Sequence, residues 1–195
     1  MTNNIPILTI EEVANEIGKC KKCPLYQTRH NVVPGEGNTH SKIVFIGEAP
    51  GEEEDFKGIP FVGRAGQLFS KILQSVNIKR EDIFITNMLK CRPPGNRNPS
   101  KSELETCLPY LETQIALINP KIIVTLGNIP TQFILETTKG ITRMRGNWFD
   151  WLGGIKIFPM FHPSYLLRNA STAPGSPKAK TWLDIKTLKE AMEDL

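Results

Sequence analysis

The sequence predicts an α/β fold, in which a central, mainly parallel sheet of four strands lies between two layers of helices (α/β/α). Two observations carry this prediction. Short apolar runs alternate with segments whose apolar residues recur at helical spacing, and the connections between them are short. The 195 residues suffice for one sizeable core, so we expect a single domain spanning 1–195. The expected strands are 42–47, 83–86, 121–127 and 155–161.

Capping boxes mark the starts of two expected helices. Thr9 precedes Glu12 by three residues, which predicts a helix that runs to about Ile17. Ser100 and Glu103 form the same pattern ahead of a long segment with apolar residues at helical spacing. The remaining expected elements are helices at 65–77, from about residue 130 and at the carboxy terminus, and an irregular loop at 52–64.

Three polar segments follow expected strands directly. They are GEAPGEEED (47–55), Asn87 and HPSYLLRN (162–169). In parallel sheets the carboxyl ends of the strands share one edge, and ligands bind beyond that edge. We therefore expect these segments, far apart in sequence, to be neighbours in space and to form the functional site.

Acidic residues are concentrated in the first of these segments. The chain has a net charge of +4, but residues 47–55 hold five acids and no Lys or Arg, so removing them leaves +9. A basic body with one acidic loop suits a polyanionic partner. No apolar run reaches the ~18–20 residues that span a bilayer, and the amino terminus lacks a signal-peptide pattern. We expect a cytoplasmic protein without membrane contact.

The four cysteines form a Cys-x2-Cys pair, Cys20 and Cys23, and a Cys-x15-Cys pair, Cys91 and Cys107. Disulfides are disfavoured in the cytoplasm, so this pattern indicates a metal site or a redox pair. Four thiolates suit tetrahedral zinc or an iron–sulfur cluster, and spacing alone does not separate the two. The alternative for Cys107 is an ordinary core residue, because it lies on the apolar face of its expected helix.

Several motifs together resemble the family 4 uracil-DNA glycosylases, the iron–sulfur group of that superfamily. They are GEAPGEEED, GIPFVGRAG, ITN ahead of KCRPP, the four-cysteine frame and HPSYLL, in the family's order between Cys20 and Arg168. The resemblance implies an enzyme that flips uracil out of DNA and hydrolyses its N-glycosidic bond, leaving an abasic site for base excision repair. It also implies a [4Fe-4S] cluster held by Cys20, Cys23, Cys91 and Cys107.

The resemblance also implies the catalytic groups. Glu48 would stabilise the positive charge that develops on the sugar and position the attacking water. His162 would donate a hydrogen bond to uracil O2, for which a neutral imidazole suffices. Glu54 would lie near uracil C5 and exclude the thymine methyl. Family 1 enzymes carry a loop resembling GQDPYH at this position, in which the aspartate handles the water and the tyrosine ring excludes thymine. This chain has Ala49 and Gly51 at those two positions, so both tasks would fall to Glu48 and Glu54.

Base recognition is expected from an amide and a ring. Asn87 offers a donor and an acceptor that match uracil O4 and N3–H. Phe61 would stack on the flipped base. The expected substrate-binding set is Gly47, Glu48, Ala49, Phe61, Asn87 and His162. Four of these have an ordinary structural alternative: an exposed loop acid for Glu48, a core phenylalanine for Phe61, a strand-ending asparagine for Asn87 and a core histidine for His162.

DNA contacts are expected at two places. Tyr165, Leu166 and Leu167 would form an exposed apolar wedge, with Arg168 beside it to meet a phosphate. The proline-rich loop carries a basic cluster that we expect to contact phosphates in a salt-sensitive way. Its members are Lys90, Arg92, Arg97 and Lys101.

The expected partner is uracil-containing DNA, single- or double-stranded, with free uracil as product. We expect a monomer, and a sliding clamp is a candidate further partner. The main alternative is a non-catalytic or covalent uracil-DNA binding protein of the same superfamily. Related covalent binders carry a histidine in a basic insert after the Asn strand, and KCRPPGNRNPSK has none. A nucleotide-binding protein is a third reading, weakened by the acids in the glycine turn.

Overall fold

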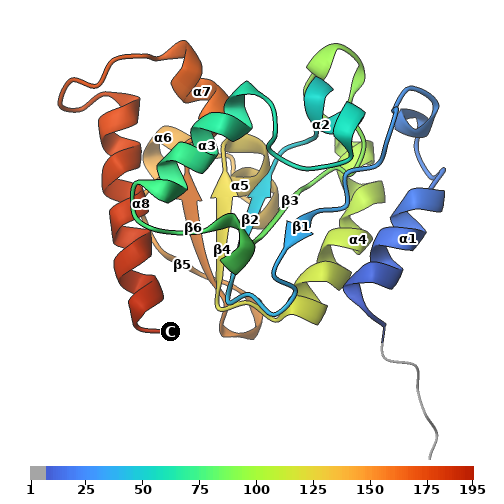
Figure 1. Ribbon diagram of the computed structural model, residues 1–195, viewed down its shortest axis with the longest axis horizontal. Coiled ribbons are helices and arrows are strands. Elements are labelled where there is room, and N and C mark those ends of the chain that lie inside the picture. Colours follow the sequence, from blue (N-terminus) through green and yellow to red (C-terminus); the bar gives the residue numbers. More distant parts are fainter. Residues whose placement is uncertain (1–7) are drawn as a thin grey trace, which may run out of the picture.

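A computed structural model describes residues 8–195 and contains a six-stranded sheet in the order β1-β3-β2-β4-β6-β5 (Figure 1). The four central strands are parallel, whereas β1 and β5 pair antiparallel at the two edges. The strands are β1 (Glu36–Gly37), β2 (Ile43–Gly47), β3 (Phe84–Asn87), β4 (Ile122–Leu126), β5 (Phe149–Asp150) and β6 (Lys156–Met160).

The predicted α/β class and mainly parallel sheet are confirmed, but the predicted count of four strands is wrong. All four expected strands are present, and two edge strands of two residues each are added. Such short strands contain no apolar run, so the pattern used for the other four has nothing to detect in them.

The central strands are mostly apolar because helices cover both faces of the sheet. Every residue of β2 and β4 is buried. Alternate side chains enter different cores: Val44 and Ile46 pack on one side, and Ile43 and Phe45 on the other. The period of two along a strand therefore divides a continuous apolar run between two hydrophobic layers.

The helices divide between these two layers. Side chains of α4 and α5 enter the core that contains Val44, and α1 packs on α4. Side chains of α3 and α8 enter the opposite core. The helices are α1 (Ile10–Lys19), α2 (Glu52–Lys57), α3 (Arg64–Gln74), α4 (Lys101–Ile118), α5 (Asn128–Ile134), α6 (Ile141–Met144), α7 (Pro163–Arg168) and α8 (Pro177–Glu193). None of those in residues 8–195 is long and apolar enough to cross a bilayer.

Both predicted capping boxes are present. The backbone N–H of Glu12 donates to Thr9 Oγ1 at 3.2 Å, and the N–H of Thr9 donates back to the Glu12 carboxylate at 2.8 Å. Ser100 and Glu103 make the same reciprocal pair at the start of α4. These caps satisfy N–H groups that the first helical turn leaves free, so the helix starts were readable from the sequence.

The expected irregular loop at 52–64 is wrong in its first half, where α2 forms. All four residues of its first turn are acidic, and negative charge at a helix N-terminus is favoured by the helix dipole. Gly58 ends the helix with a left-handed φ of 71°. Acids that indicated a chemical role therefore also start a helix, and only the segment after Gly58 is irregular.

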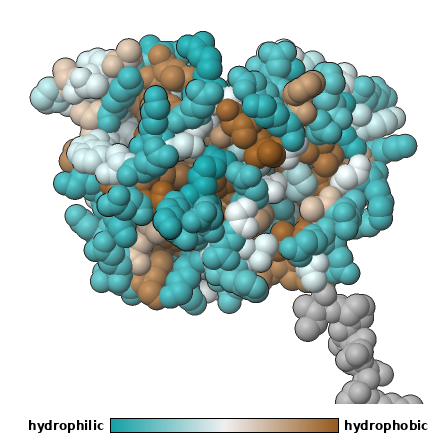
Figure 2. Space-filling model, viewed as in Figure 1, coloured by the Kyte–Doolittle hydropathy of each residue, from teal (hydrophilic) through white to brown (hydrophobic). Residues whose placement is uncertain are grey.

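The carboxyl ends of the strands meet at one edge, as predicted. Gly47, the last residue of β2, pairs with Asn87, the last residue of β3. Figure 1 shows α2 and α7 above this same edge. In Figure 2 the upper rim is hollowed between the part that carries α3 and α7 and the part that carries α2.

Candidate active site

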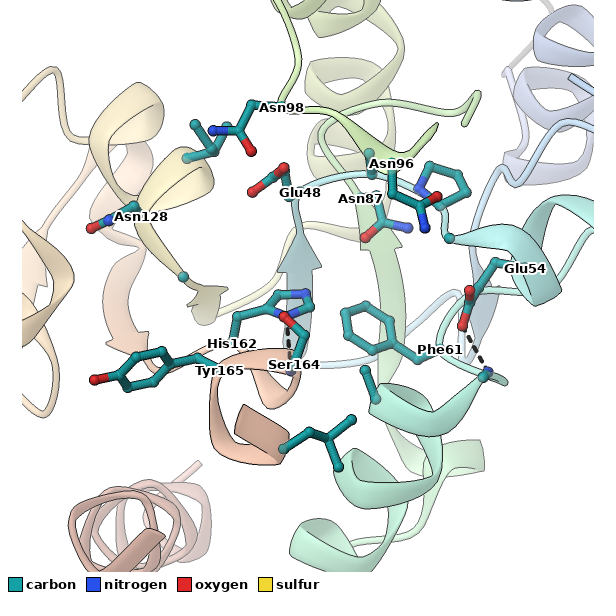
Figure 3. Close-up of a pocket in the computed structure, with 18 of the residues that line it drawn as sticks. Glu48, Glu54, Phe61, Asn87, Asn96, Asn98, Asn128, His162, Ser164 and Tyr165 are labelled. Atoms are coloured by element: carbon teal, nitrogen blue, oxygen red, sulfur yellow. Dashed lines mark hydrogen bonds between the residues drawn. The ribbon is translucent and has the colours of Figure 1, made fainter. Parts of the chain in front are cut away.

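A cavity of about 870 Å³ lies at this edge of the sheet, between the β2–α2 turn, the end of β3 and α7 (Figure 3). It brings together most of the residues that the sequence singled out. Those that line it are Glu48, Ala49, Glu54, Phe61, Asn87, Arg97, His162, Tyr165, Leu167 and Arg168. Asn98, Asn128 and Ser164, which the sequence analysis did not select, line it as well.

Gly47, Asn87 and Phe61 meet in close contact at one side of this cavity. A Cβ on Gly47 would lie 2.3 Å from Asn87 Oδ1 and 2.6 Å from Phe61 Cζ, so only glycine allows this approach. Asn87 is 2% exposed, and its Oδ1 has no hydrogen-bond partner within residues 8–195. A buried acceptor without a partner is rare in folded proteins, and here it borders a cavity.

Phe61 is held in a strained conformation. Its φ is +54°, a left-handed value that is uncommon for a bulky side chain. Arg80 donates to the Phe61 carbonyl at 3.2 Å and to the Pro60 carbonyl at 2.8 Å. A Cβ on Gly66 would lie 2.0 Å from the Phe61 backbone, so α3 approaches this turn closely. The ring stands 5.1 Å from that of Phe69 and 5.8 Å from the His162 imidazole, centroid to centroid.

Glu54 fixes the same turn from its other side. Its Oε1 accepts hydrogen bonds from the backbone N–H groups of Val62 at 2.9 Å and Gly63 at 2.8 Å (Figure 3). These bonds tie α2 to the residues that follow Phe61. One carboxylate oxygen of Glu54 is therefore committed to holding the Phe61 loop, a role that the sequence analysis did not foresee.

His162 is held as a neutral imidazole with a defined tautomer. Its Nδ1 accepts the backbone N–H of Ser164 at 3.1 Å and lies 2.8 Å from Ser164 Oγ. Because Nδ1 is an acceptor, the ring proton is on Nε2. Burial, and then the positive charge of Arg168, lower the pKa of His162 to about 4. The ring thus offers a neutral N–H donor near neutral pH.

Glu48 is the first residue after β2 and is half-buried. Burial raises the pKa of its carboxyl above the usual value. Its backbone carbonyl accepts the N–H of Leu89 at 3.1 Å, and the Gly47 carbonyl accepts that of Met88 at 2.9 Å. These two bonds lock the turns after β2 and β3 together and set the position of the Glu48 side chain in the cavity.

Comparison with known proteins identifies the family. Residues 34–186 match the family model of the uracil DNA glycosylase superfamily. The type-4 uracil-DNA glycosylase of Thermotoga maritima is 53% identical over 163 residues, which cover 83% of this chain and 85% of that protein. The chain belongs to the type-4 uracil-DNA glycosylase family. The type-4 enzyme of Archaeoglobus fulgidus is 45% identical over 82% of this chain and 83% of its own length.

A second family lies further away. The type-5 uracil-DNA glycosylase of Mycobacterium leprae is 28% identical over 80% of this chain and 85% of that protein. The chain is thus more similar to the type-4 enzyme of Thermotoga maritima than to this type-5 enzyme. The resemblance to the type-4 family that the motifs indicated is confirmed.

In this type-4 family member, α7 presents only part of the expected apolar wedge. Tyr165 and Leu167 are 36% and 39% exposed, whereas Leu166 is 1% exposed and packs inside. The expectation that Leu166 belongs to an exposed tip is therefore wrong. A helix turns about 100° per residue, so three consecutive side chains cannot share one face. Arg168 is exposed at the end of α7.

The basic cluster of the proline-rich loop is also smaller than expected. Lys90 is 1% exposed and cannot contact phosphate from its observed position. Arg97 pairs with the nearly buried Glu103, which lowers the pKa of that carboxyl to about 2. Arg92 donates to Asn96 at 2.8 Å and has Glu52 3.6 Å away. Lys101 is exposed.

The four cysteines of this family member line one small pocket between the amino-terminal segment and α4. All four are free thiols, and Arg29 donates a hydrogen bond to Cys91 Sγ at 3.1 Å. Within residues 8–195 no three Cys, His, Asp or Glu side chains are grouped tightly enough to hold a single metal ion.

Two functional candidates, Ser164 and Arg80, escaped the sequence analysis, and the role of a third, Lys90, was misjudged. Ser164 sets the His162 tautomer, and its position two residues after a strand-end histidine is a usable signal, because serine often hydrogen-bonds a nearby backbone turn. Arg80 supports the Phe61 turn from 19 residues away in the chain, and no local pattern marks it. The burial of Lys90 is likewise invisible in sequence, since lysine is almost never buried.

Proposed function

We propose that this protein is a monofunctional uracil-DNA glycosylase, which flips uracil out of DNA and hydrolyses its N-glycosidic bond. The abasic site that remains is the substrate for base excision repair. The observation that carries the proposal is the contact of Gly47, Asn87 and Phe61 at the side of the cavity, where an amide acceptor has no partner. A flat pyrimidine with an N–H on its Watson–Crick edge would supply the hydrogen-bond donor that Asn87 Oδ1 lacks.

The base would be read by Asn87 and stacked by Phe61. Asn87 Oδ1 would accept from uracil N3–H, and its amide N–H would donate to O4. Cytosine has the opposite pattern at these positions, so the same amide would reject it unless the amide rotated. The left-handed backbone of Phe61, supported by Arg80, holds the ring toward the base site before substrate arrives.

Bond cleavage would be shared between Glu48 and His162. As the C1′–N1 bond breaks, its electron pair moves into the uracil ring, and the negative charge on O2 is stabilised by the Nε2–H of His162. The sugar becomes positively charged, and the Glu48 carboxylate stabilises that charge. Glu48 also orients a water molecule, whose oxygen forms the new bond to C1′. The Glu48 carboxylate accepts the proton that this water releases. The raised pKa of Glu48 makes its carboxylate a better base.

Glu54 would contribute by shape. Its bonds to Val62 and Gly63 fix the loop that carries Phe61, and this fixed loop limits the space beside uracil C5. Ala49 and Gly51, which replace an acid and an aromatic ring of the family 1 pattern, leave both tasks to Glu48 and Glu54.

DNA would lie across the rim of the cavity. Tyr165 and Leu167, exposed on α7, would fill the gap left by the flipped nucleotide, and Arg168 would contact a phosphate. Arg92 and Arg97 would contribute less than free cations, because each has a carboxylate partner.

The cysteine-lined pocket would hold a [4Fe-4S] cluster through Cys20, Cys23, Cys91 and Cys107. Four thiols are the ligand set of such a cluster, and all four line the same pocket. When bound, the cluster supplies a cross-link between the amino-terminal segment and α4. No step of the reaction requires it.

The test is an end-labelled oligonucleotide with one uracil, incubated with the protein and then treated with alkali. Scission only after alkali, and none with the matched thymine oligonucleotide, is the expected result. A stable shifted complex without scission would instead support the non-catalytic or covalent binding protein. A colourless preparation that contains zinc and no iron would overturn the cluster assignment.

A further inference from the structure

We propose that Lys90 is a positioning residue, which holds the end of β3 so that Asn87 faces the base. The inference rests on the proposed role of Asn87 as the base reader. Lys90 lies three residues after Asn87 and directly before Cys91, at the junction between the cavity and the cysteine-lined pocket. Lys90 lines the cysteine-lined pocket, and its hydrogen bond to the Asn87 carbonyl connects it to the cavity.

The ammonium group of Lys90 is fully occupied inside the protein. It donates to Thr86 Oγ1 at 2.6 Å, to the backbone carbonyl of Asn87 at 2.9 Å and to Gln114 Oε1 at 2.7 Å. Three acceptors match the three N–H donors of a lysine. Nothing remains for solvent or for a DNA phosphate.

The acceptors connect three parts of the fold. Gln114 belongs to α4, and its amide N–H donates to the Pro34 carbonyl at 2.9 Å. Thr86 Oγ1 donates to the same carbonyl at 2.8 Å. The end of β3, the middle of α4 and the segment before β1 are thus joined through one buried cation.

A role in placing Asn87 explains why a lysine is used here. Burying a charge carries a desolvation penalty, and a well-packed apolar residue of similar volume is often as stable or more so. The side-chain Oδ1 of Asn87 has no partner in residues 8–195, so its amide is placed by its backbone and by packing. The bond from Lys90 to the Asn87 carbonyl anchors that backbone at the residue itself.

The competing role for Lys90 is to balance negative charge at the cysteine pocket, which it also lines. A double-mutant cycle separates the two roles, because residues that act through one another show non-additive effects. The cycle combines Lys90→Met with Asn87→Ala and measures the single-turnover excision rate on uracil DNA, with iron content and thermal midpoint recorded for each variant. Lys79→Met is the matched control, since Lys79 is exposed in the segment that precedes β3.

We expect Lys90→Met to lower the rate about 10- to 100-fold in the wild-type background, since misplacement by about 1 Å is worth about that much. In the Asn87→Ala background it should lower the rate by less than about threefold. Lys90→Gln, which keeps a donor, should retain more activity than Lys90→Met. Should Lys90→Met not fold, Thr86→Val removes one acceptor with little change of shape and should show the same non-additivity.

Two results would overturn the inference alone: a Lys90→Met rate like that of the wild type, or effects of Lys90→Met and Asn87→Ala that multiply fully. A loss of rate that parallels loss of iron in both backgrounds would assign the lysine to the cysteine pocket. If Asn87→Ala itself excises within about threefold of the wild type, the proposed reader fails, and the inference fails with it.

Discussion

Gly47→Ala adds one methyl group where the base, Asn87 and Phe61 are expected to meet. The new Cβ would lie 2.3 Å from Asn87 Oδ1 and 2.6 Å from Phe61 Cζ, whereas ordinary contacts are 3.4–4 Å. Gly47 is not among the glycines with positive φ, so alanine is compatible with the backbone and the effect is steric. The Asn87 amide and the Phe61 ring must therefore each move away from the new Cβ by about 1 Å. A displacement of that size lowers the rate about 100-fold where geometry decides catalysis.

The stability effect should be modest by comparison. Overpacking of a well-filled site costs about 1–3 kcal/mol, which a folded domain tolerates. The matched control is Gly18→Ala in α1, where a Cβ would meet nothing within 4 Å. That change should leave activity intact and stabilise the helix by about 0.5–1 kcal/mol.

The assay is single-turnover excision of uracil from an end-labelled oligonucleotide, with urea unfolding of the same preparations. The expected result is a Gly47→Ala protein that unfolds cooperatively but excises about 100-fold more slowly. Activity within about threefold of the wild type would show that the contact of Gly47, Asn87 and Phe61 does not form the base site. A loss explained by unfolding would be seen directly in the urea curve.

Three further changes probe other parts of the account. The pKa of His162 is about 4 in the folded protein and 6.5 as its ordinary value, so between these two pH values the unfolded chain binds a proton that the folded protein does not. The free energy of unfolding should therefore fall as the pH drops through this window. In urea unfolding, His162→Gln should lose less stability than the wild type between about pH 7 and about pH 5. Arg168→Met should reduce the salt slope of DNA binding by about one, measured by anisotropy, while Arg97→Met should change the slope less and destabilise the fold, because it leaves Glu103 without its partner. An equal fall in slope for both would contradict the ion pairing seen here. Cys107→Ala should lose iron and visible colour, and a variant that keeps a full complement of iron would remove Cys107 from the ligand set.

Local chemistry made much of the fold predictable from the sequence. The two capping boxes are reciprocal hydrogen bonds between residues three apart in the chain, so the local sequence is enough to predict where these two helices begin. The four central strands are almost entirely buried, which produces short, mostly apolar runs. Once β2 and β3 are parallel, their carboxyl ends share one edge of the sheet, where Gly47 and Asn87 pair.

Features that depend on tertiary packing were missed or misread. The acids of α2 fit both a chemical loop and a helix N-terminus, and the chain alone does not separate these meanings. Which face of α7 turns inward depends on how the helix docks, so Leu166 was placed with its exposed neighbours. Lys90 is buried because Thr86, Asn87 and Gln114 surround it, and one of those lies 24 residues away.

The most direct test of the central claim compares binding with turnover in Glu48→Gln. Glutamine keeps the shape of the side chain but has no negative charge to stabilise the sugar cation or accept a proton. The account expects Glu48→Gln to bind uracil-containing DNA with an affinity like that of the wild type and to excise uracil about 10²- to 10⁴-fold more slowly. Excision at the wild-type rate by Glu48→Gln would contradict it.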